Sequence, residues 1–305
     1  MINKITLSII IVNFNTETFL INCLNSVKSS DFPKNKLEII VIDNNSKVNP
    51  SDYLKKQFPK VKFIINDKNE GFAKANNKAI KYAKGSYVLF LNPDTILPPK
   101  VLSVLIQFME KNKLVGVSTA RVELENGTID DICHRGFPTP WNSFCHFSGL
   151  NKIMPLSKIF NGYHLGYKNM EIPHEIDSCS GAFMLVRKKA GEQVGWFDED
   201  YFWYGEDIDF CFKVKNNNWK IYFIPAEIVL HFKGVASGIK KHSSAIASAS
   251  SETRLLATHA RFEVMRIFYE KHYKNKYPKF LKNLIFTGIK IKEILTVCLQ
   301  KVNHN

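Results

Sequence analysis

Three carboxylates within four positions are the part of the sequence best suited to chemistry. Glu206, Asp207 and Asp209 follow an aromatic run and a glycine, and the residues after them take up helical spacing. A carboxylate at such a place can act as the general base that deprotonates a hydroxyl group. Acids in a first helical turn also complement the helix dipole and cap free N–H groups. The stretch alone therefore fits a catalytic and a structural role equally well.

A second group of polar side chains follows the apolar segments in the first 120 residues. These residues are Asn15, Asp43, Asn44, Asn69 and Asp94. Asp94 is the last residue of an Asn-Pro-Asp sequence, which is common in turns. Its carboxylate is also an oxygen ligand of the kind that Mg²⁺ or Mn²⁺ prefers. Asp43 begins Asp-Asn-Asn-Ser, which by composition is equally a turn or a helix cap.

The elements that must position these groups alternate between two patterns. Apolar runs at 5–14, 37–42, 61–65, 87–91 and 115–119 are typical of buried strands, and helical spacing follows several of them. This order predicts an α/β fold in which helices flank a mostly parallel sheet. Ligands bind beyond the carboxyl ends of strands in such sheets, so we expect the polar group to share one rim. Dinucleotide-binding and P-loop motifs do not occur.

The pattern weakens after residue 120. A hairpin is expected around Asn126-Gly127, and residues 135–175 read as an insertion on the substrate side. Strands are predicted at 183–186, 220–224 and 228–232, the last containing His231. Two helices are predicted at 252–273 and 280–299.

Composition limits the classes of protein that the chain can represent. Its 305 residues are 45% hydrophobic and 23% charged, which supports a large folded core. The net charge of +14 suggests a polyanionic partner, and no nucleic-acid-binding motif is recognised. The six cysteines lack metal-binding spacing and are expected to be reduced core thiols of a cytosolic protein. Neither a signal peptide nor a membrane-spanning helix is expected.

The end of the chain carries a disproportionate share of the charge. Residues 252–305 hold 11 basic and 4 acidic residues, which gives 11 − 4 = +7. After Pro278, apolar residues at helical spacing alternate with lysines. One interpretation is an ordinary helix packed on the domain; the other is a helix lying on an anionic membrane surface, with its apolar face down.

Together these landmarks resemble the family 2 glycosyltransferases with the GT-A fold, and especially their rhamnosyltransferase-like branch. The matching segments are residues 8–15, 41–46, 69–76, 91–94, 180–182, 195–198 and 204–211, with His231. The resemblance implies a GT-A domain over 1–235, with a nucleotide-binding half (1–120) and an acceptor half (121–235). Residues 236–305 would be a helical, basic, amphipathic extension.

The resemblance also implies roles for individual residues on the donor side. Asp94 would bind a divalent metal that bridges the donor diphosphate, and His231 would be a further ligand, although a lone histidine is often structural. Asn92 stands where many relatives carry a second acid. Asp43 and Asn44 would contact the nucleotide base, and the ribose and diphosphate would lie against Asn15, Asn69, Gly71 and Asn76.

On the acceptor side, the resemblance implies that Asp207 is the general base, with Glu206 as the alternative. Asp209 is then expected to be a structural cap or a solvent-facing acid. Ser180, Gly181, Ala182 and Trp196 would line the sugar and acceptor pocket, or would simply pack. The expected reaction is one inverting displacement that moves a sugar from a nucleotide donor to a hydroxyl group.

The expected donor is dTDP-rhamnose, with a UDP-hexose as the alternative, and the expected acceptor is a glycan or glycolipid. Other expected partners are Mg²⁺ or Mn²⁺, an anionic membrane and a second copy of the chain in a homodimer; nucleic acid is not among them. The expected location is the cytoplasm, at the inner face of the cell membrane. A non-catalytic protein that kept the fold is the alternative from a different class.

Overall fold

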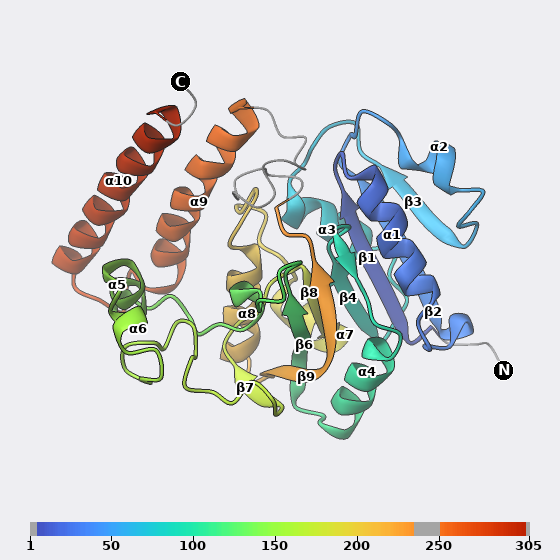
Figure 1. The fold of residues 1–305 in the computed structure, drawn as a ribbon, viewed down its shortest axis with the longest axis horizontal. Coiled ribbons are helices and arrows are strands. Elements are labelled where there is room, and N and C mark those ends of the chain that lie inside the picture. The colour runs from blue at the N-terminus through green and yellow to red at the C-terminus, as the bar shows by residue number, and fades with distance from the viewer. Residues whose placement is uncertain (1–4, 235–250, 303–305) are drawn as a thin grey trace.

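The computed structural model describes residues 5–234 and 251–302. Its centre is a nine-stranded sheet with the strand order β3-β2-β1-β4-β8-β6-β9-β5, and β7 pairs with β9 (Figure 1). The strands are β1 (Leu7–Asn13), β2 (Leu37–Asp43), β3 (Val61–Ile65), β4 (Tyr87–Leu91), β5 (Thr95–Ile96), β6 (Val115–Glu123), β7 (His174–Ile176), β8 (Phe183–Arg187) and β9 (Lys220–His231).

Helices pack on the sheet and extend beyond it. In chain order they are α1 (Glu17–Lys28), α2 (Pro50–Leu54), α3 (Phe72–Ile80), α4 (Val101–Lys111), α5 (Pro140–Ser148), α6 (Leu150–Ile153), α7 (Lys188–Val194), α8 (Glu206–Asn216), α9 (Ser251–His272) and α10 (Lys279–Val302). Two short 3₁₀ turns, Lys34–Lys36 and Asp131–Cys133, join neighbouring elements.

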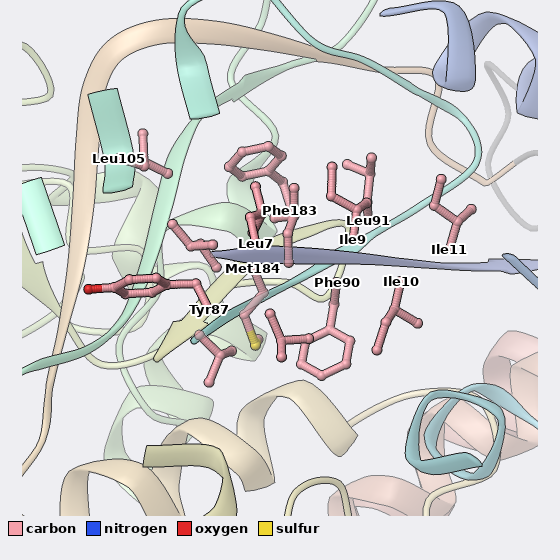
Figure 2. Packing of buried hydrophobic residues seen from close by; sticks show 14 of the residues in the cluster. Leu7, Ile9, Ile10, Ile11, Tyr87, Phe90, Leu91, Leu105, Phe183 and Met184 are labelled. Atoms are coloured by element: carbon pink, nitrogen blue, oxygen red, sulfur yellow. The ribbon is translucent and has the colours of Figure 1, made fainter. Parts of the chain in front are cut away.

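The apolar run of β1 is explained by burial on both faces of the sheet. Figure 2 shows Ile9 and Ile11 on one side of the strand and Ile10 on the other, and all three are fully buried. β1 pairs in parallel with β2 and with β4, and β2 pairs in parallel with β3. These strands therefore end at one edge, as the sequence predicts.

The second half of the sheet differs from the strand order that simple βα alternation suggests. β8 lies between β4 and β6 and is antiparallel to both. The sheet is parallel from β3 to β4 and mixed beyond. Residues 220–224 and 228–232, expected as two strands, belong to one strand, β9, whose pairing with β6 is irregular opposite Ala120 and Arg121. The expected hairpin is reduced to a single bridge between Glu123 and Ile129.

The last two helices pack on the domain through α8. Phe268 of α9 and Tyr273, just after that helix, form a small apolar cluster with Phe212 of α8, and α10 runs beside α9 (Figure 1). Five of the six cysteines are buried and unpaired, as predicted for core thiols, whereas Cys298 is exposed. Within 5–234 and 251–302, every helix is too short or too polar to cross a bilayer.

Candidate active site

The pairing of β5 with β9 brings Asp94 and His231 together. β4 ends at Leu91, the chain turns, and Thr95 of β5 then pairs opposite His231. The backbone N–H of Phe232 donates to the Asp94 carbonyl at 2.9 Å. Asp94 Oδ1 consequently lies 3.4 Å from His231 Nε2, and both side chains are almost completely buried. Two residues that are 137 positions apart thus face each other at the rim.

Asp130 holds His231 from its other side. His231 Nδ1 lies 2.8 Å from Asp130 Oδ2, and Lys233 contacts the same carboxylate. Burial lowers the pKa of His231, but the charges of Asp94 and Asp130 outweigh it and raise that pKa to about 9. Burial likewise raises the pKa of Asp130, and the hydrogen bond with His231 and the charge of Lys233 reverse this and lower it to about 2.

This arrangement fits a divalent cation. Metal-binding histidines commonly donate their second ring N–H to a carboxylate, which is the relation of His231 to Asp130. The 3.4 Å between Asp94 Oδ1 and His231 Nε2 suits two ligands of one ion. No cluster of three or more such ligand side chains occurs in the part of the chain that the structure describes. Mg²⁺ sites often rely on one or two carboxylates plus substrate phosphates, so the sparse set agrees with a metal shared with a ligand.

Asp43 and Asn15 form one network at the ends of β1 and β2. Asn13 and Ser46 donate to Asp43 Oδ1, each at 2.6 Å, and the backbone N–H of Ser46 donates to Oδ2 at 2.8 Å. Ser46 Oγ also accepts the backbone N–H of Asn15 at 2.8 Å, and Asn15 Oδ1 accepts the N–H of Lys47 at 2.9 Å. The carboxylate and amide therefore fix the shape of the rim.

Asn44 ties the end of β2 to the loop before α3. Its Nδ2 donates to the Gly71 carbonyl at 3.1 Å, and its Oδ1 accepts from Asn66 at 2.8 Å. Asn69 Oδ1 accepts the N–H of Gly71 at 2.9 Å, which closes a tight turn in front of the helix. In the first turn of α3, Asn76 Nδ2 donates to the Phe72 carbonyl at 2.9 Å.

The loop before α3 (residues 66–71), which we call the donor loop because its residues are expected on the donor side, lies against the loop before α8. The N–H of Phe72 donates to the Phe202 carbonyl at 3.1 Å. Gly71 has φ +82°, and a Cβ there would lie 2.5 Å from the same oxygen, so only glycine fits this contact. The two loops are thereby held at a fixed separation.

The 180–182 loop joins the same rim from β8. A Cβ on Gly181 would lie 3.0 Å from the Phe72 ring, and the N–H of Asn92 donates to the Ala182 carbonyl at 3.0 Å. Ser180 Oγ accepts the N–H of Ala182 at 3.1 Å. The Asp94 turn, the 180–182 loop, the donor loop and the acidic stretch consequently form one chain of contacts.

Asp207 pairs with a residue that the sequence did not single out. Arg135 donates to Asp207 Oδ2 at 2.9 Å, and the two side chains are 8% and 13% exposed. Burial lowers the pKa of Arg135, but the charge of Asp207 outweighs it and raises the pKa above its usual range. Asp207 Oδ1 accepts the N–H of Ile208 at 2.7 Å. The carboxylate is thus oriented from both sides.

Glu206 has a different environment from its neighbour. It is 6% exposed, and its Oε2 makes no hydrogen bond among the described residues. Burial, and then the charge of Asp207, raise the pKa of Glu206 well above its usual range. The neutral form of Glu206 is therefore favoured at the start of α8.

Asp209 is buried, not solvent-facing. It is 1% exposed, lies 2.6 Å from His272 Nε2 of α9 and 3.1 Å from Lys213 of its own helix. The expectation of a solvent-facing acid was wrong because α9 covers this side of α8, and helical spacing within α8 cannot reveal a distant covering element. Asp209 does not cap α8 either, since Gly205 is at the N-cap position and no side chain caps this helix; its role is the ion pair with α9 and Lys213.

Trp196 is not brought to the rim. Its ring lies parallel to that of Phe210 and edge-on to Phe90, and a Cβ on Gly191 would lie 2.2 Å from it. Its backbone has φ +63°. Trp196 therefore fills the space between α7 and α8. Of the two roles that the sequence left open, a pocket wall or simple packing, these contacts support packing.

Arg135 and Asp130 are the residues that sequence reasoning missed. In the sequence, Arg135 is only the first residue of the expected insertion. The neighbouring residues do not indicate whether its side chain is buried or exposed. Asp130 follows the hairpin at 122–129 in the way that Asp94 follows its strand. The same rule, an acid just after a strand, could have identified Asp130.

Comparisons with known proteins identify the family of the chain. The model of "Glycosyl transferase family 2" matches residues 8–195. Rhamnosyltransferase WbbL of Escherichia coli (strain K12) is 30% identical over 176 residues, 53% of this chain and 61% of WbbL. The chain thus spans about three fifths of that relative. N-acetylglucosaminyl-diphospho-decaprenol L-rhamnosyltransferase of Mycobacterium tuberculosis (strain ATCC 25618 / H37Rv) is 24% identical over 216 residues, 66% of this chain and 68% of that protein.

A solved structure extends the likeness to three dimensions. Mannosyltransferase PcManGT from Pyrobaculum calidifontis, in complex with GDP-Man and Mn²⁺, superimposes with a TM-score of 0.58 at 14% identity, over 87% of this chain and 63% of that one. At this identity the likeness concerns the fold alone. The family match covers more than half of the sequence. The chain therefore belongs to glycosyl transferase family 2, with the GT-A fold.

Proposed function

We propose that the chain transfers rhamnose from dTDP-rhamnose to a hydroxyl group of a glycan or lipid-linked glycan, with inversion at the anomeric carbon. The observation that carries the proposal is the single rim that joins the Asp94–His231 pair to the Arg135–Asp207 pair through the contact of Phe72 with Phe202. The two relatives named as rhamnosyltransferases support the sugar.

The donor would lie across the ends of β1, β2 and β4. Asp43 and Asn44 would face the base, and Asn15, Asn69, Gly71 and Asn76 would border the ribose and diphosphate. Asn76 Oδ1 is buried and makes no hydrogen bond among the described residues, so it is available to a ligand hydroxyl. Ser180, Gly181 and Ala182 would border the sugar, between the donor loop and the Asp94 turn.

Asp94 and His231 would hold Mg²⁺ or Mn²⁺, with Asp130 fixing the ring of His231. The bound ion would neutralise charge that develops on the departing diphosphate. Mn²⁺ in the structure of PcManGT supports this assignment. Asn92, which stands where many relatives carry a second acid, lies beside this site. Its Nδ2 is 3.5 Å from His231 Nε2.

Asp207 would act as the general base. It takes the proton from the acceptor hydroxyl, the oxygen forms a bond to the anomeric carbon, and the bond from that carbon to the diphosphate breaks. Arg135 would orient the carboxylate through Oδ2. Glu206 is less suited to the role because its raised pKa favours the neutral form. A single displacement of this kind inverts the anomeric centre.

The acceptor side would face a membrane. α10 carries apolar residues on its outer face and lysines beside them, which supports the interpretation of a helix lying on anionic lipid. The enzyme would then work in the cytoplasm at the inner face of the cell membrane, where a lipid-linked acceptor is within reach.

A donor panel tests the proposal. Purified enzyme is incubated with Mg²⁺ or Mn²⁺ and with dTDP-rhamnose, UDP-glucose, UDP-GlcNAc or GDP-mannose, and release of nucleoside diphosphate is measured. Fastest release from dTDP-rhamnose, and its loss on chelation of the metal, is the expected result. Preference for a UDP-hexose would instead support the alternative donor, and binding without release from any donor would support a non-catalytic protein.

A further inference from the structure

The outer face of α10 is an exposed apolar stripe. Its members are between 53% and 72% exposed: Phe280, Leu284, Ile291, Ile294, Leu295 and Leu299. At about 100° of rotation per residue they fall on one side of the helix. The opposite side packs inward, where Ile285 and Phe286 meet the aromatic cluster of α9. Within residues 5–234 and 251–302, the stripe is thus left uncovered along α10.

A second apolar patch lies on the insertion between Arg135 and β7. Its members come from α5, α6 and the loop to residue 159, and are between 39% and 76% exposed: Trp141, Phe144, Phe147, Ile153, Leu156 and Ile159. Trp141 Nε1 donates to the Ile159 carbonyl at 2.9 Å, and its ring centre lies 5.7 Å from that of Phe144. The patch is therefore held together by its own contacts.

The stripe and the patch adjoin at one contact. Lys292 Nζ of α10 lies 4.2 Å from the centre of the Phe147 ring of α5. α5 and α6 also lie next to the lower part of α10 in Figure 1. The two exposed apolar regions therefore adjoin, and we call them together the docking surface: residues 140–159 and α10.

The charge around the docking surface is positive. By helical rotation Lys290 and Lys292 lie on opposite edges of the stripe. Lys152 and Lys158 belong to the patch. Glu293, the acid within α10, lies on the inward side, where it is 2.6 Å from Arg266 and 2.8 Å from His259 of α9. Its charge is thus compensated within the protein, whereas the lysines border the apolar surface.

We propose that the docking surface binds an anionic phospholipid bilayer, with the 140–159 patch and α10 inserted together. An exposed apolar area of this extent marks an interaction site. Aromatic and leucine side chains bordered by lysines suit the headgroup region of an anionic membrane. A second copy of the chain would present the same lysines, and like charges would then oppose each other.

The position of the patch links it to the acceptor side of the active site. Four residues separate Arg135, which contacts Asp207, from Pro140 at the start of α5. Binding through this surface would bring a lipid-borne acceptor towards Asp207. This last consequence rests on the proposed function, whereas membrane binding itself does not depend on catalysis.

Vesicle co-sedimentation of the full chain tests the proposal. The wild type is compared with Phe144→Glu/Leu156→Glu in the patch and Leu284→Glu/Leu295→Glu in the stripe. The control is Val48→Glu/Leu114→Glu, which changes two equally exposed apolar residues elsewhere. Binding to vesicles of phosphatidylcholine and phosphatidylglycerol should fall about tenfold or more in each test pair and stay unchanged in the control. Phosphatidylcholine alone should bind the wild type much more weakly.

Three results would overturn the proposal. One is a patch pair that binds like the control; another is equal binding of the wild type to neutral and anionic vesicles. The third is a wild-type dimer in size-exclusion chromatography that the test pairs dissociate, with no vesicle binding, because a second copy would then cover the surface. Hydrolysis of dTDP-rhamnose without vesicles is measured in parallel. If neither the wild type nor any variant hydrolyses dTDP-rhamnose, the proposed function is contradicted. The conclusion from vesicle binding does not depend on this result.

Discussion

Arg135 and Asp207 form a nearly buried ion pair between the insertion and the start of α8. Moving the two charges out of water costs several kcal/mol per ion. The attraction between them offsets this cost only while both partners are present. Arg135 also uses its backbone, since its N–H donates to the Ser178 carbonyl at 3.1 Å and its carbonyl accepts from Ser178 at 2.9 Å. The pair therefore serves stability as well as the geometry of the proposed base.

Loss of the arginine alone should be costly. Arg135→Met leaves the Asp207 carboxylate buried without its partner, and we expect the free energy of unfolding to fall by about 3 kcal/mol. In Arg135→Met/Asp207→Asn no buried charge is left alone, so the double variant should lose clearly less than the sum of the two single variants. Urea unfolding of all four proteins measures this coupling. Strictly additive losses would mean that the pair is not coupled.

At the residue scale, the sequence identified groups that stand at the ends of their own elements. Asp94 follows a strand, His231 ends one, and Asp207 lies in the first turn of a helix. The local sequence pattern is enough to mark such positions. Arg135 and Asp130 become important only through partners that are 72 and 101 positions away. For Trp196 the sequence left a pocket wall and simple packing open, and the contacts with Phe210 and Gly191 support packing.

At the element scale, periodicity predicted the strands well but not their order. β3 and β4 have the predicted bounds, and β1 and β2 differ by a residue or two. The insertion of β8 between β4 and β6 could not be predicted, since an apolar run does not specify its neighbours. The two-residue strand β5, which aligns Asp94 with His231, is too short to give any periodic signal.

The insertion is closed by a pair of histidines. His134, before the insertion, and His174, in β7, approach to 2.6 Å between their Nε2 atoms, and His134 is 4% exposed. Burial, and then the charge of His174, lower the pKa of His134 from 6.5 to about 4. The folded protein therefore binds fewer protons than the unfolded chain between these pH values.

Acidification should consequently destabilise the protein in a defined window. The contribution of His134 is complete above pH 6.5 and is lost as the pH falls towards 4, by up to about 3 kcal/mol. Replacing it by His134→Gln should flatten this part of the profile. Urea unfolding at pH 7.5, 6 and 5 measures the slope. His259→Gln, at a half-exposed position, is the control, and a slope that His134→Gln leaves unchanged would refute this assignment.

The attachment of α9 to α8 depends on a few aromatic side chains. Phe268 is 6% exposed and lies 5.6 Å from Phe212, centre to centre. Phe268→Ala should lower the free energy of unfolding by about 3 kcal/mol, because it leaves a cavity between the helices. Phe280→Ala, at a 72% exposed position of α10, should cost less than about 0.5 kcal/mol. Chemical denaturation compares the two, and equal losses would contradict the packing role.

At the scale of the whole molecule, the proposed chemistry is divided between two halves of one sheet. The proposed nucleotide contacts lie at the ends of β1 and β2 in the parallel half. Asp94 follows β4 of that half but meets His231 of β9 in the mixed half, and Asp207 lies at the start of α8. The contact of Phe72 with Phe202 joins the halves, and the docking surface lies beyond the acceptor side. Donor binding and proton removal should therefore be separable by mutation.

Asp207→Asn tests this division most directly. The amide keeps the shape of the carboxylate but cannot accept the acceptor's proton, so the transfer rate from dTDP-rhamnose should fall by about a thousandfold. Donor affinity, measured by calorimetry with Mn²⁺, should stay within about threefold of the wild type, whereas Asp94→Asn should weaken it by about tenfold or more. Transfer by Asp207→Asn at the wild-type rate would contradict the account.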